Sequence, residues 1–142
     1  MCRSHQALDP ERCVIRMLVV DDEQAFSAMV SGYFSNFGCE VVSAVSAEEA
    51  LQVCPVFRPD ICVVDNRLPG MSGAQLIKQI RLFDRNVFIA MCTIDRQEDA
   101  LTGLARDDID LFFKKPLLFS AFCDALIGAM ARITSGNAGR QL

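Results

Sequence analysis

The chain has 142 residues, which suits one domain with a sizeable core and leaves no room for a second domain. Hydrophobic residues make up 51% and charged residues 23%, a balance that excludes disordered and fibrous chains. The net charge of -4 argues against direct binding of nucleic acid, because phosphate binding requires clustered Lys and Arg side chains.

From Val14 onward, short apolar runs alternate with amphipathic stretches of helical length. Ser46 and Glu49 form a capping-box pattern, so we expect a helix to open there and to stop before Pro55. Five strand-helix units in a row require right-handed crossovers, which predicts an α/β domain with a parallel sheet. The predicted strands are residues 14–20, 39–45, 61–65, 86–92 and 110–113, and the other predicted helices are residues 23–37, 73–83, 95–105 and 120–133.

Cysteine content and the chain ends indicate where the protein acts. The seven cysteines form no C-x-x-C pair, and an odd, unpatterned count is typical of the reducing cytosol. The N-terminal residues lack the apolar core of a signal peptide, and no later run approaches the length of a membrane span. We therefore expect a cytoplasmic protein without membrane contact, built of a flexible leader (1–13), one domain (14–133) and a flexible tail (134–142).

Polar side chains follow four of the predicted strands at their carboxyl ends, where ligands bind in such sheets. Neighbouring carboxylates repel each other by about 4 kcal/mol per close pair at an intermediate dielectric, and a divalent cation relieves that cost. Oxygen ligands alone suit Mg²⁺, so we predict a magnesium site. The side chains are Asp21 and Asp22 after the first strand, Asp65 after the third, Thr93 after the fourth and Lys115 after the fifth.

This set of groups predicts phosphoryl chemistry. A carboxylate held beside Mg²⁺ and a lysine is arranged to attack a phosphoryl group, which makes Asp65 the candidate nucleophile. Lys115 would neutralise charge on the phosphoryl oxygens, and the Thr93 hydroxyl would hydrogen-bond another of them. Glu23, by contrast, is expected to cap the helix that follows it.

Four segments together resemble one family: LVVDDE, VVDNRLPGMSG, MCT and FFKKP. Over residues 14–133 the chain is similar to the receiver domain of two-component response regulators. The resemblance implies a flavodoxin-like, three-layer α/β sandwich with five parallel strands in the order 2-1-3-4-5. It also implies that Asp65 accepts a phosphoryl group from the phosphohistidine of a sensor histidine kinase or a histidine phosphotransfer protein.

The resemblance assigns further roles residue by residue. Asp22 would bind Mg²⁺ directly together with Asp65, Asp21 would act mainly through water, and the backbone carbonyl of Arg67 would be a further ligand. Phe112, three residues before the lysine, occupies the position of an aromatic switch that responds to the hydroxyl at position 93.

The chain departs from the family pattern at two places. Ile94 stands where the residue after the switch hydroxyl is usually small, and we expect its side chain to cover the entrance to the site. Arg67 and Asp95 carry opposite charges and are expected to pair across that entrance as a weaker gate. Asp107 and Asp108 replace a Gly-Ala pair before the last strand.

The leading hypothesis is a stand-alone receiver that catalyses only its own phosphorylation and dephosphorylation. Its fourth helix, fifth strand and fifth helix would present the changed surface to a downstream protein or to a second copy, since nothing after Ile133 suggests an output domain. A relay intermediate that passes phosphate to a histidine phosphotransfer protein remains an alternative. An aspartate-nucleophile phosphohydrolase is a second alternative, although that family would have a D-x-D motif after the first strand and this chain has Asp21 and Glu23 there. A receiver-like module that is never phosphorylated is a third alternative.

Overall fold

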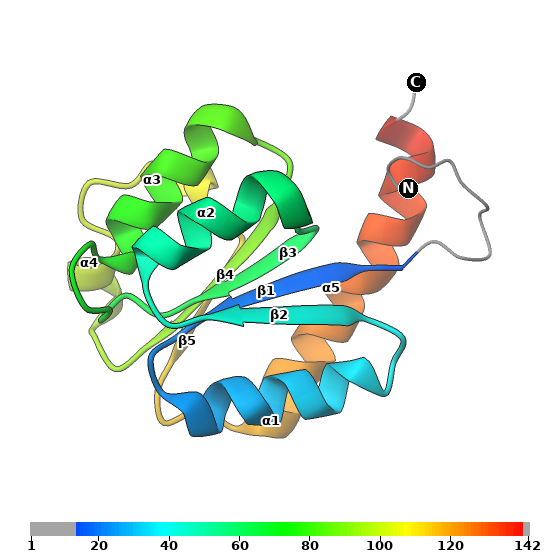
Figure 1. The fold of residues 1–142 in the computed structure, drawn as a ribbon, viewed down its shortest axis with the longest axis horizontal. Helices are drawn as coiled ribbons and strands as arrows, with labels where there is room; N and C mark the ends of the chain where they lie inside the picture. The colour runs from blue at the N-terminus through cyan, green and yellow to red at the C-terminus, as the bar shows by residue number, and fades with distance from the viewer. Residues whose placement is uncertain (1–13, 141–142) are drawn as a thin grey trace.

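The computed structural model describes the backbone of residues 14–140 and the side chains of residues 14–135. It contains one parallel sheet with the order β2-β1-β3-β4-β5, so the predicted fold class and strand order are confirmed (Figure 1). The predicted leader, residues 1–13, lies outside the described residues. The strands are β1 (Arg16–Val20), β2 (Glu40–Ala44), β3 (Ile61–Val64), β4 (Phe88–Thr93) and β5 (Leu111–Lys114).

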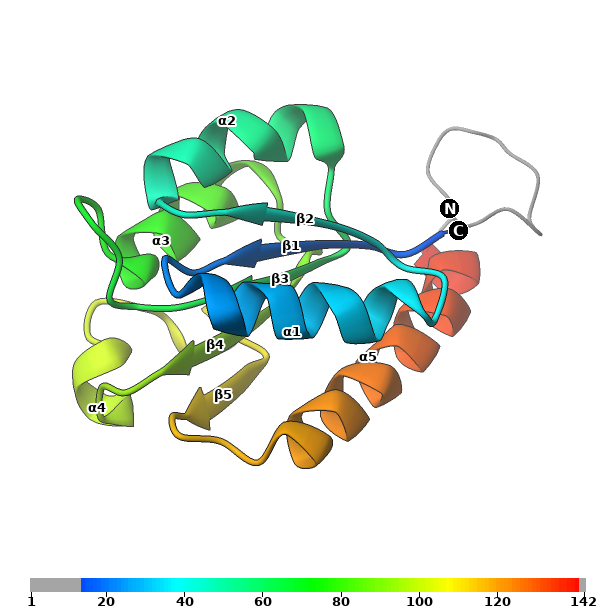
Figure 2. The same cartoon turned by 60° about the horizontal axis from the view of Figure 1, so that its bottom comes forward.

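Helices cover both faces of the sheet and make a three-layer sandwich. Helices α1 and α5 lie side by side on one face, while α2 and α3 lie on the other (Figures 1 and 2). In the described part of the chain, no helix combines the length and apolar character needed to cross a membrane. The helices are α1 (Gln24–Ser35), α2 (Ala47–Phe57), α3 (Gly73–Phe83), α4 (Gln97–Ala100) and α5 (Phe119–Arg140), with a short 3₁₀ helix at Arg106–Asp108.

The central strands are buried on both faces, which explains why their sequences are continuous apolar runs and do not alternate with polar residues. In β1, Leu18 and Val20 pack into the core under α2 and α3, while Met17 and Val19 pack into the core under α1 and α5. All four side chains are fully buried. This burial holds the strand ends, and thus the polar residues that follow them, in a rigid position.

The prediction that α2 stops before Pro55 is wrong, because the helix continues to Phe57. The Ser46 hydroxyl accepts a hydrogen bond from the Glu49 amide at 3.1 Å, so the helix does open where the sequence predicts. Pro55 lies in the last turn, where its missing N–H removes one backbone hydrogen bond. Cys54 is buried and Phe57 packs against the core, and this packing outweighs the lost bond.

The last two helices also differ from the predicted ranges. The helix predicted over residues 95–105 is wrong in extent, because α4 is a single turn that is followed by turns, with Gly103 at a positive φ of 86°. The predicted end of the last helix at Ile133 is wrong as well, since α5 runs to Arg140. Once a helix is nucleated, each added residue adds one backbone hydrogen bond. The polar Thr134 is accommodated in the helix because its hydroxyl donates a hydrogen bond to the Met130 carbonyl at 2.9 Å.

Candidate functional site

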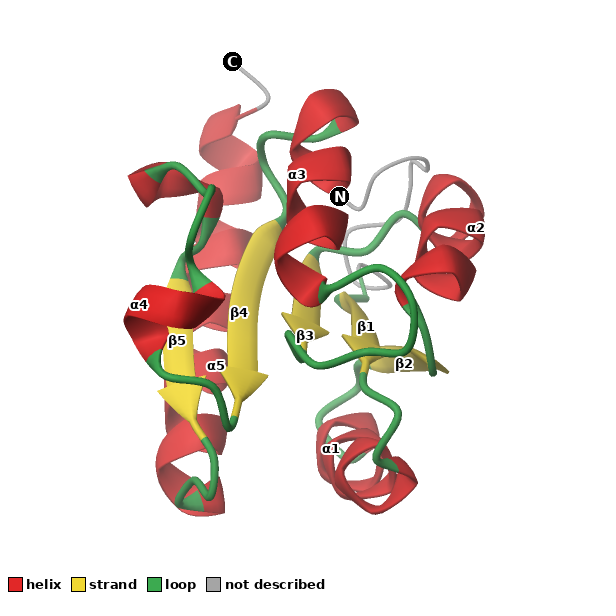
Figure 3. Cartoon of the chain, turned by 90° about the vertical axis from the view of Figure 1, so that its left-hand side faces the viewer, coloured by secondary structure: helices red, strands yellow, loops and turns green. Residues whose placement is uncertain are grey.

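Three aspartates gather at the carboxyl ends of β1 and β3, the edge of the sheet that faces the viewer in Figure 3. One carboxylate oxygen from each of Asp21, Asp22 and Asp65 lies within 4.8 Å of the others. Asp21 and Asp65 are only 2% and 8% exposed, whereas Asp22 is exposed. The structure therefore brings together the three acids that the sequence placed after these strands.

Backbone hydrogen bonds at the strand ends hold the two buried aspartates in place. The Asp65 amide donates to the Val20 carbonyl at 2.9 Å, which continues the ladder between the strands by one residue. Each carboxylate then accepts a bond from the amide two residues later, Asp21 from Glu23 at 2.8 Å and Asp65 from Arg67 at 3.1 Å. Such turns direct both carboxylates away from the strand axis and into one cluster.

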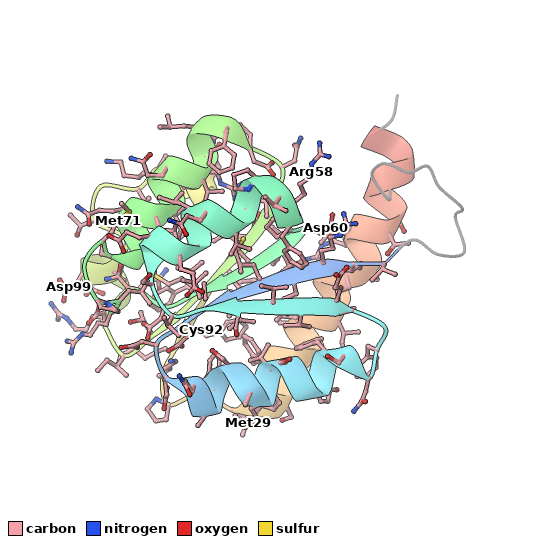
Figure 4. The ribbon with its side chains drawn as sticks, viewed as in Figure 1. Met29, Arg58, Asp60, Met71, Cys92 and Asp99 are labelled. Atoms are coloured by element: carbon pink, nitrogen blue, oxygen red, sulfur yellow. The ribbon has the colours of Figure 1, made fainter. Side chains whose placement is uncertain are left out.

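The loop after Asp65 is locked by close backbone approach and by side-chain caps. A methyl group on Gly73 would lie 2.2 Å from the Asp65 carbonyl oxygen, so only glycine fits there. The Asn66 side chain accepts from the Ala74 amide at 2.9 Å, and Glu48 of α2 accepts from the Met71 amide at 3.3 Å. Figure 4 shows Met71 at this edge, opposite the edge where Arg58 is labelled.

Lys115 is the cation of the cluster. Its ammonium nitrogen lies 2.7 Å from Asp21 Oδ2, 3.2 Å from Glu23 Oε1 and 3.6 Å from Asp65 Oδ2. It also lies 4.5 Å from the centre of the Phe26 ring. The Lys115 side chain is only 11% exposed, so its contacts with the buried Asp21 and Asp65 are made largely out of water, whereas Glu23 is itself 60% exposed.

Burial and charge shift the pKa values of this pair. Burial raises the pKa of Asp21 and outweighs the lowering caused by the hydrogen bond from Lys115. Burial by itself lowers the pKa of Lys115, but the hydrogen bond to Asp21 and the charges of Asp65 and Asp21 outweigh it, and the net pKa is raised. Lys115 is therefore a permanent cation at neutral pH, which suits a group that neutralises a phosphoryl oxygen.

Glu23 does not have the role expected from the sequence. It occupies the position before α1, but its side chain makes no capping hydrogen bond to that helix. Its carboxylate instead accepts from Lys115 at 3.2 Å. The prediction that Glu23 caps the helix is wrong, because a partner 92 residues away in the sequence competes for the carboxylate.

Asp95 connects the loop after Asp65 to the end of β4. Its carboxylate accepts from Asn66 Nδ2 at 2.9 Å and from Arg67 Nε at 2.5 Å, and its amide donates to Thr93 Oγ1 at 3.3 Å. The hydrogen bond from Asn66 is the main cause that lowers the pKa of Asp95, and the hydrogen bond from Arg67 lowers this pKa further. Asn66 was missed in the sequence analysis, although an Asn beside a candidate nucleophile in a turn is a recognisable signal.

Thr93 and Phe112 lie on the same face of the sheet. Thr93 is fully buried, and Met91, two residues before it, pairs in register with Phe112 of β5. Because side chains alternate along a strand, Thr93 and Met91 point to the same side, where Phe112 packs against the core with α2 and α3. Ile94, the next residue, lies beyond the end of β4 and is 51% exposed.

A five-stranded parallel sheet in the order 2-1-3-4-5, with an acidic cluster and a lysine at its carboxyl edge, places the chain in the receiver class of signalling domains. The family model of the response regulator receiver domain matches residues 17–127, and the chain belongs to this family of two-component signalling proteins.

Several known proteins are similar to the chain. Sporulation initiation phosphotransferase F of Bacillus subtilis is 24% identical over 111 residues, which cover 78% of this chain and 90% of that protein. Chemotaxis protein CheY of Thermotoga maritima is 30% identical over 112 residues, covering 78% and 93%. The crystal structure of the receiver domain of a putative Luxo repressor from Vibrio parahaemolyticus shares the fold, with a TM-score of 0.79 at 18% identity over 88% of this chain and 96% of that one. Other curated relatives are longer, and the chain spans 20% of one and 46% of another.

Proposed function

We propose that the protein is a signalling switch in which Asp65 accepts a phosphoryl group from the phosphohistidine of a sensor kinase or a histidine phosphotransfer protein. The observation that carries the proposal is the convergence on Asp65 of two further aspartates and the Lys115 ammonium, 3.6 Å from Asp65 Oδ2. Nothing else among the described residues gathers three such acids. The site thus has a nucleophile, a charge-neutralising group and the donors for a cation.

The donor set fits Mg²⁺. Hard oxygen ligands within 4.8 Å of one another suit a small divalent cation, which keeps several waters and needs few carboxylates. Asp22 and Asp65 would hold it directly, Asp21 through water, and the Arg67 carbonyl would complete the protein ligands. When bound, Mg²⁺ would supply positive charge to the phosphoryl oxygens.

The residues of the chain would divide the transfer step among them. An oxygen of Asp65 forms a bond to phosphorus as the bond to the donor's nitrogen breaks, and the donor histidine leaves with the electron pair. Lys115 donates a hydrogen bond to one phosphoryl oxygen and neutralises its charge. The Thr93 hydroxyl, which accepts from the Asp95 amide at 3.3 Å, still has its own hydrogen to donate to another.

Signal transmission would use the shared face of β4 and β5. Thr93 moves toward the phosphoryl group, Phe112 packs into the space beside it, and the population of two packings shifts without a change of fold. The surface that changes consists of α4, β5 and α5, where a downstream protein or a second copy of the chain would bind. Catalysis is limited to the protein's own phosphorylation and dephosphorylation, in the cytoplasm that its cysteine composition predicts.

A relay role is the second candidate. It is favoured by the similarity to sporulation initiation phosphotransferase F, of which 90% is covered. In that role the phosphoryl group would pass from Asp65 to the histidine of a phosphotransfer protein. Return of label from the phosphorylated chain to such a protein supports relay, and release as inorganic phosphate alone supports a terminal switch. Membership of the receiver family argues against the phosphohydrolase alternative.

The test is incubation of the chain with acetyl phosphate and Mg²⁺, followed by intact mass spectrometry. We expect one added phosphate in the wild type and none in Asp65→Asn or when chelator removes the metal. Equal labelling of Asp65→Asn would show that the acceptor is another residue.

A further inference from the structure

The ammonium group of Lys115 is held by two carboxylates before any phosphoryl group arrives, because it donates hydrogen bonds to Asp21 and Glu23. A lysine has three N–H donors and no acceptor. Three carboxylates surround it, Asp21 at 2.7 Å, Glu23 at 3.2 Å and Asp65 at 3.6 Å. The ammonium lies outside hydrogen-bond distance of Asp65, so an approach to a phosphoryl oxygen there draws it away from its two hydrogen-bond partners.

Asp21 and Glu23 differ in how easily they release the lysine. The Asp21 side chain is 2% exposed, and a buried carboxylate that loses its cation is left without solvation. The Glu23 side chain is 60% exposed, so water replaces Lys115 as its partner when the bond breaks. Glu23 is therefore the carboxylate that releases the Lys115 ammonium more easily.

We infer that Glu23 is a positioning residue that restrains Lys115 in the unphosphorylated protein and competes with the phosphoryl group for its ammonium. This inference rests on the proposed phosphorylation of Asp65. In the reaction with acetyl phosphate, an oxygen of Asp65 bonds to phosphorus while the phosphorus–oxygen bond to acetate breaks and acetate leaves with the electron pair. Lys115 turns from Glu23 toward the phosphoryl oxygens as this charge arrives, and the Glu23 carboxylate passes into water.

The competition has a direction and a size. Loss of the Glu23 bond frees Lys115 for the transition state, so phosphorylation becomes faster. Because Glu23 is largely exposed, its pair with Lys115 is of the weak surface type, and the expected gain is about 1.5- to fivefold in rate.

Two substitutions separate the hydrogen bond from the charge. Glu23→Gln keeps the length of the side chain and removes the charge, whereas Glu23→Asp keeps the charge and withdraws it by about 1.5 Å, the length of one carbon–carbon bond. Glu98→Gln is the matched control, because it removes one exposed charge from α4 and leaves the carboxylates around Lys115 in place.

The first readout is the labelling rate with acetyl phosphate at saturating Mg²⁺. We expect Glu23→Gln and Glu23→Asp to label faster than the wild type by about 1.5- to fivefold and Glu98→Gln to label at the wild-type rate. If Glu23→Asp labels like the wild type, or if either Glu23 variant is slower, restraint through the Lys115 bond is refuted. If the wild type itself does not label, it is the proposed function that fails.

The second readout needs neither metal nor phosphate. Hydrogen exchange of the Lys115 ammonium, followed by nitrogen-15 NMR in the metal-free protein, reports whether its donors are held by carboxylates. We expect faster exchange in both Glu23 variants than in the wild type and in Glu98→Gln. Unchanged exchange in the Glu23 variants would overturn the inference even if their labelling rates differ.

Discussion

Gly73→Ala is the substitution that most directly tests how the loop after Asp65 is held. Gly73 is the first residue of α3, and a methyl group there would lie 2.2 Å from the Asp65 carbonyl oxygen and 2.8 Å from the Asn66 Cα. Both neighbours are backbone atoms, which cannot rotate away as a side chain can. Since carbon and oxygen do not approach closer than about 3.0 Å, the loop or the helix must shift by about 0.8 Å.

The shift has a cost in stability and in activity. Overpacking of this kind costs about 1 to 3 kcal/mol of unfolding free energy, and the rigid backbone neighbours place Gly73→Ala toward the upper end. A displacement of about 1 Å at a reacting group lowers a rate by about 100-fold. We therefore expect Gly73→Ala to lose about 2 to 3 kcal/mol in urea unfolding and most of its labelling by acetyl phosphate.

Gly32→Ala is the matched control. Gly32 lies inside α1, where an added methyl group meets nothing within 4 Å. Replacing an interior helical glycine by alanine raises stability by about 0.5 to 1 kcal/mol, and the labelling rate should stay unchanged. If Gly73→Ala unfolds within about 0.5 kcal/mol of the wild type and labels at its rate, the close approach to Asp65 does not constrain the site.

Three further substitutions test the switch and the gate. Thr93→Ala should still accept phosphate yet lose the response at Phe112, because the buried hydroxyl that follows the phosphoryl group is gone; hydrogen exchange over residues 93–120 that changes equally in wild type and variant would contradict this coupling. Ile94→Ala should speed both labelling and loss of phosphate, because the Ile94 side chain is predicted to cover the entrance to the site and a positioned water loses its attack geometry when displaced by about 1 Å. Arg67→Ala should have the smaller effect on phosphate loss, because Arg67 is 66% exposed and its pair with Asp95 is worth about 0.2 to 1 kcal/mol. The lifetime of radiolabelled phosphate on each protein is the measurement, and a lifetime that is unchanged or longer in Ile94→Ala would eliminate the gate.

The departure before β5 has a local explanation in the structure. Asp108 accepts from the Ala105 amide at 2.8 Å and pairs with Arg85 at 3.4 Å. Arg81, which is 6% exposed, donates to the Asp108 and Val87 carbonyls at 3.0 and 2.8 Å. Asp107 pairs with Arg85 as well, at 3.6 Å, so the two aspartates belong to a brace between the end of α3 and the start of β5, separate from the acidic cluster at Asp65.

The sequence by itself determined the fold class, the strand order through the family resemblance, and the set of acids and lysine at the carboxyl edge. These features depend on local patterns: continuous apolar runs give buried strands, and a polar residue directly after such a run must lie at the edge of the sheet. The capping signal at Ser46 worked for the same reason, since its hydroxyl accepts a hydrogen bond from the Glu49 amide three residues away.

Only the tertiary structure decided which of these groups are partners. Glu23 was expected to cap its own helix, but its carboxylate accepts a hydrogen bond from Lys115, 92 positions away in the sequence. Asp95 likewise accepts hydrogen bonds from Asn66 and Arg67, which lie on another loop. Pro55 and Gly73 show the same limit. At Pro55, packing of α2 against the core outweighs the lost backbone hydrogen bond. At Gly73, the close approach of the Asp65 backbone excludes every side chain. Pairing energies depend on distances in space, and local propensity does not specify which distant segments the crossovers bring together.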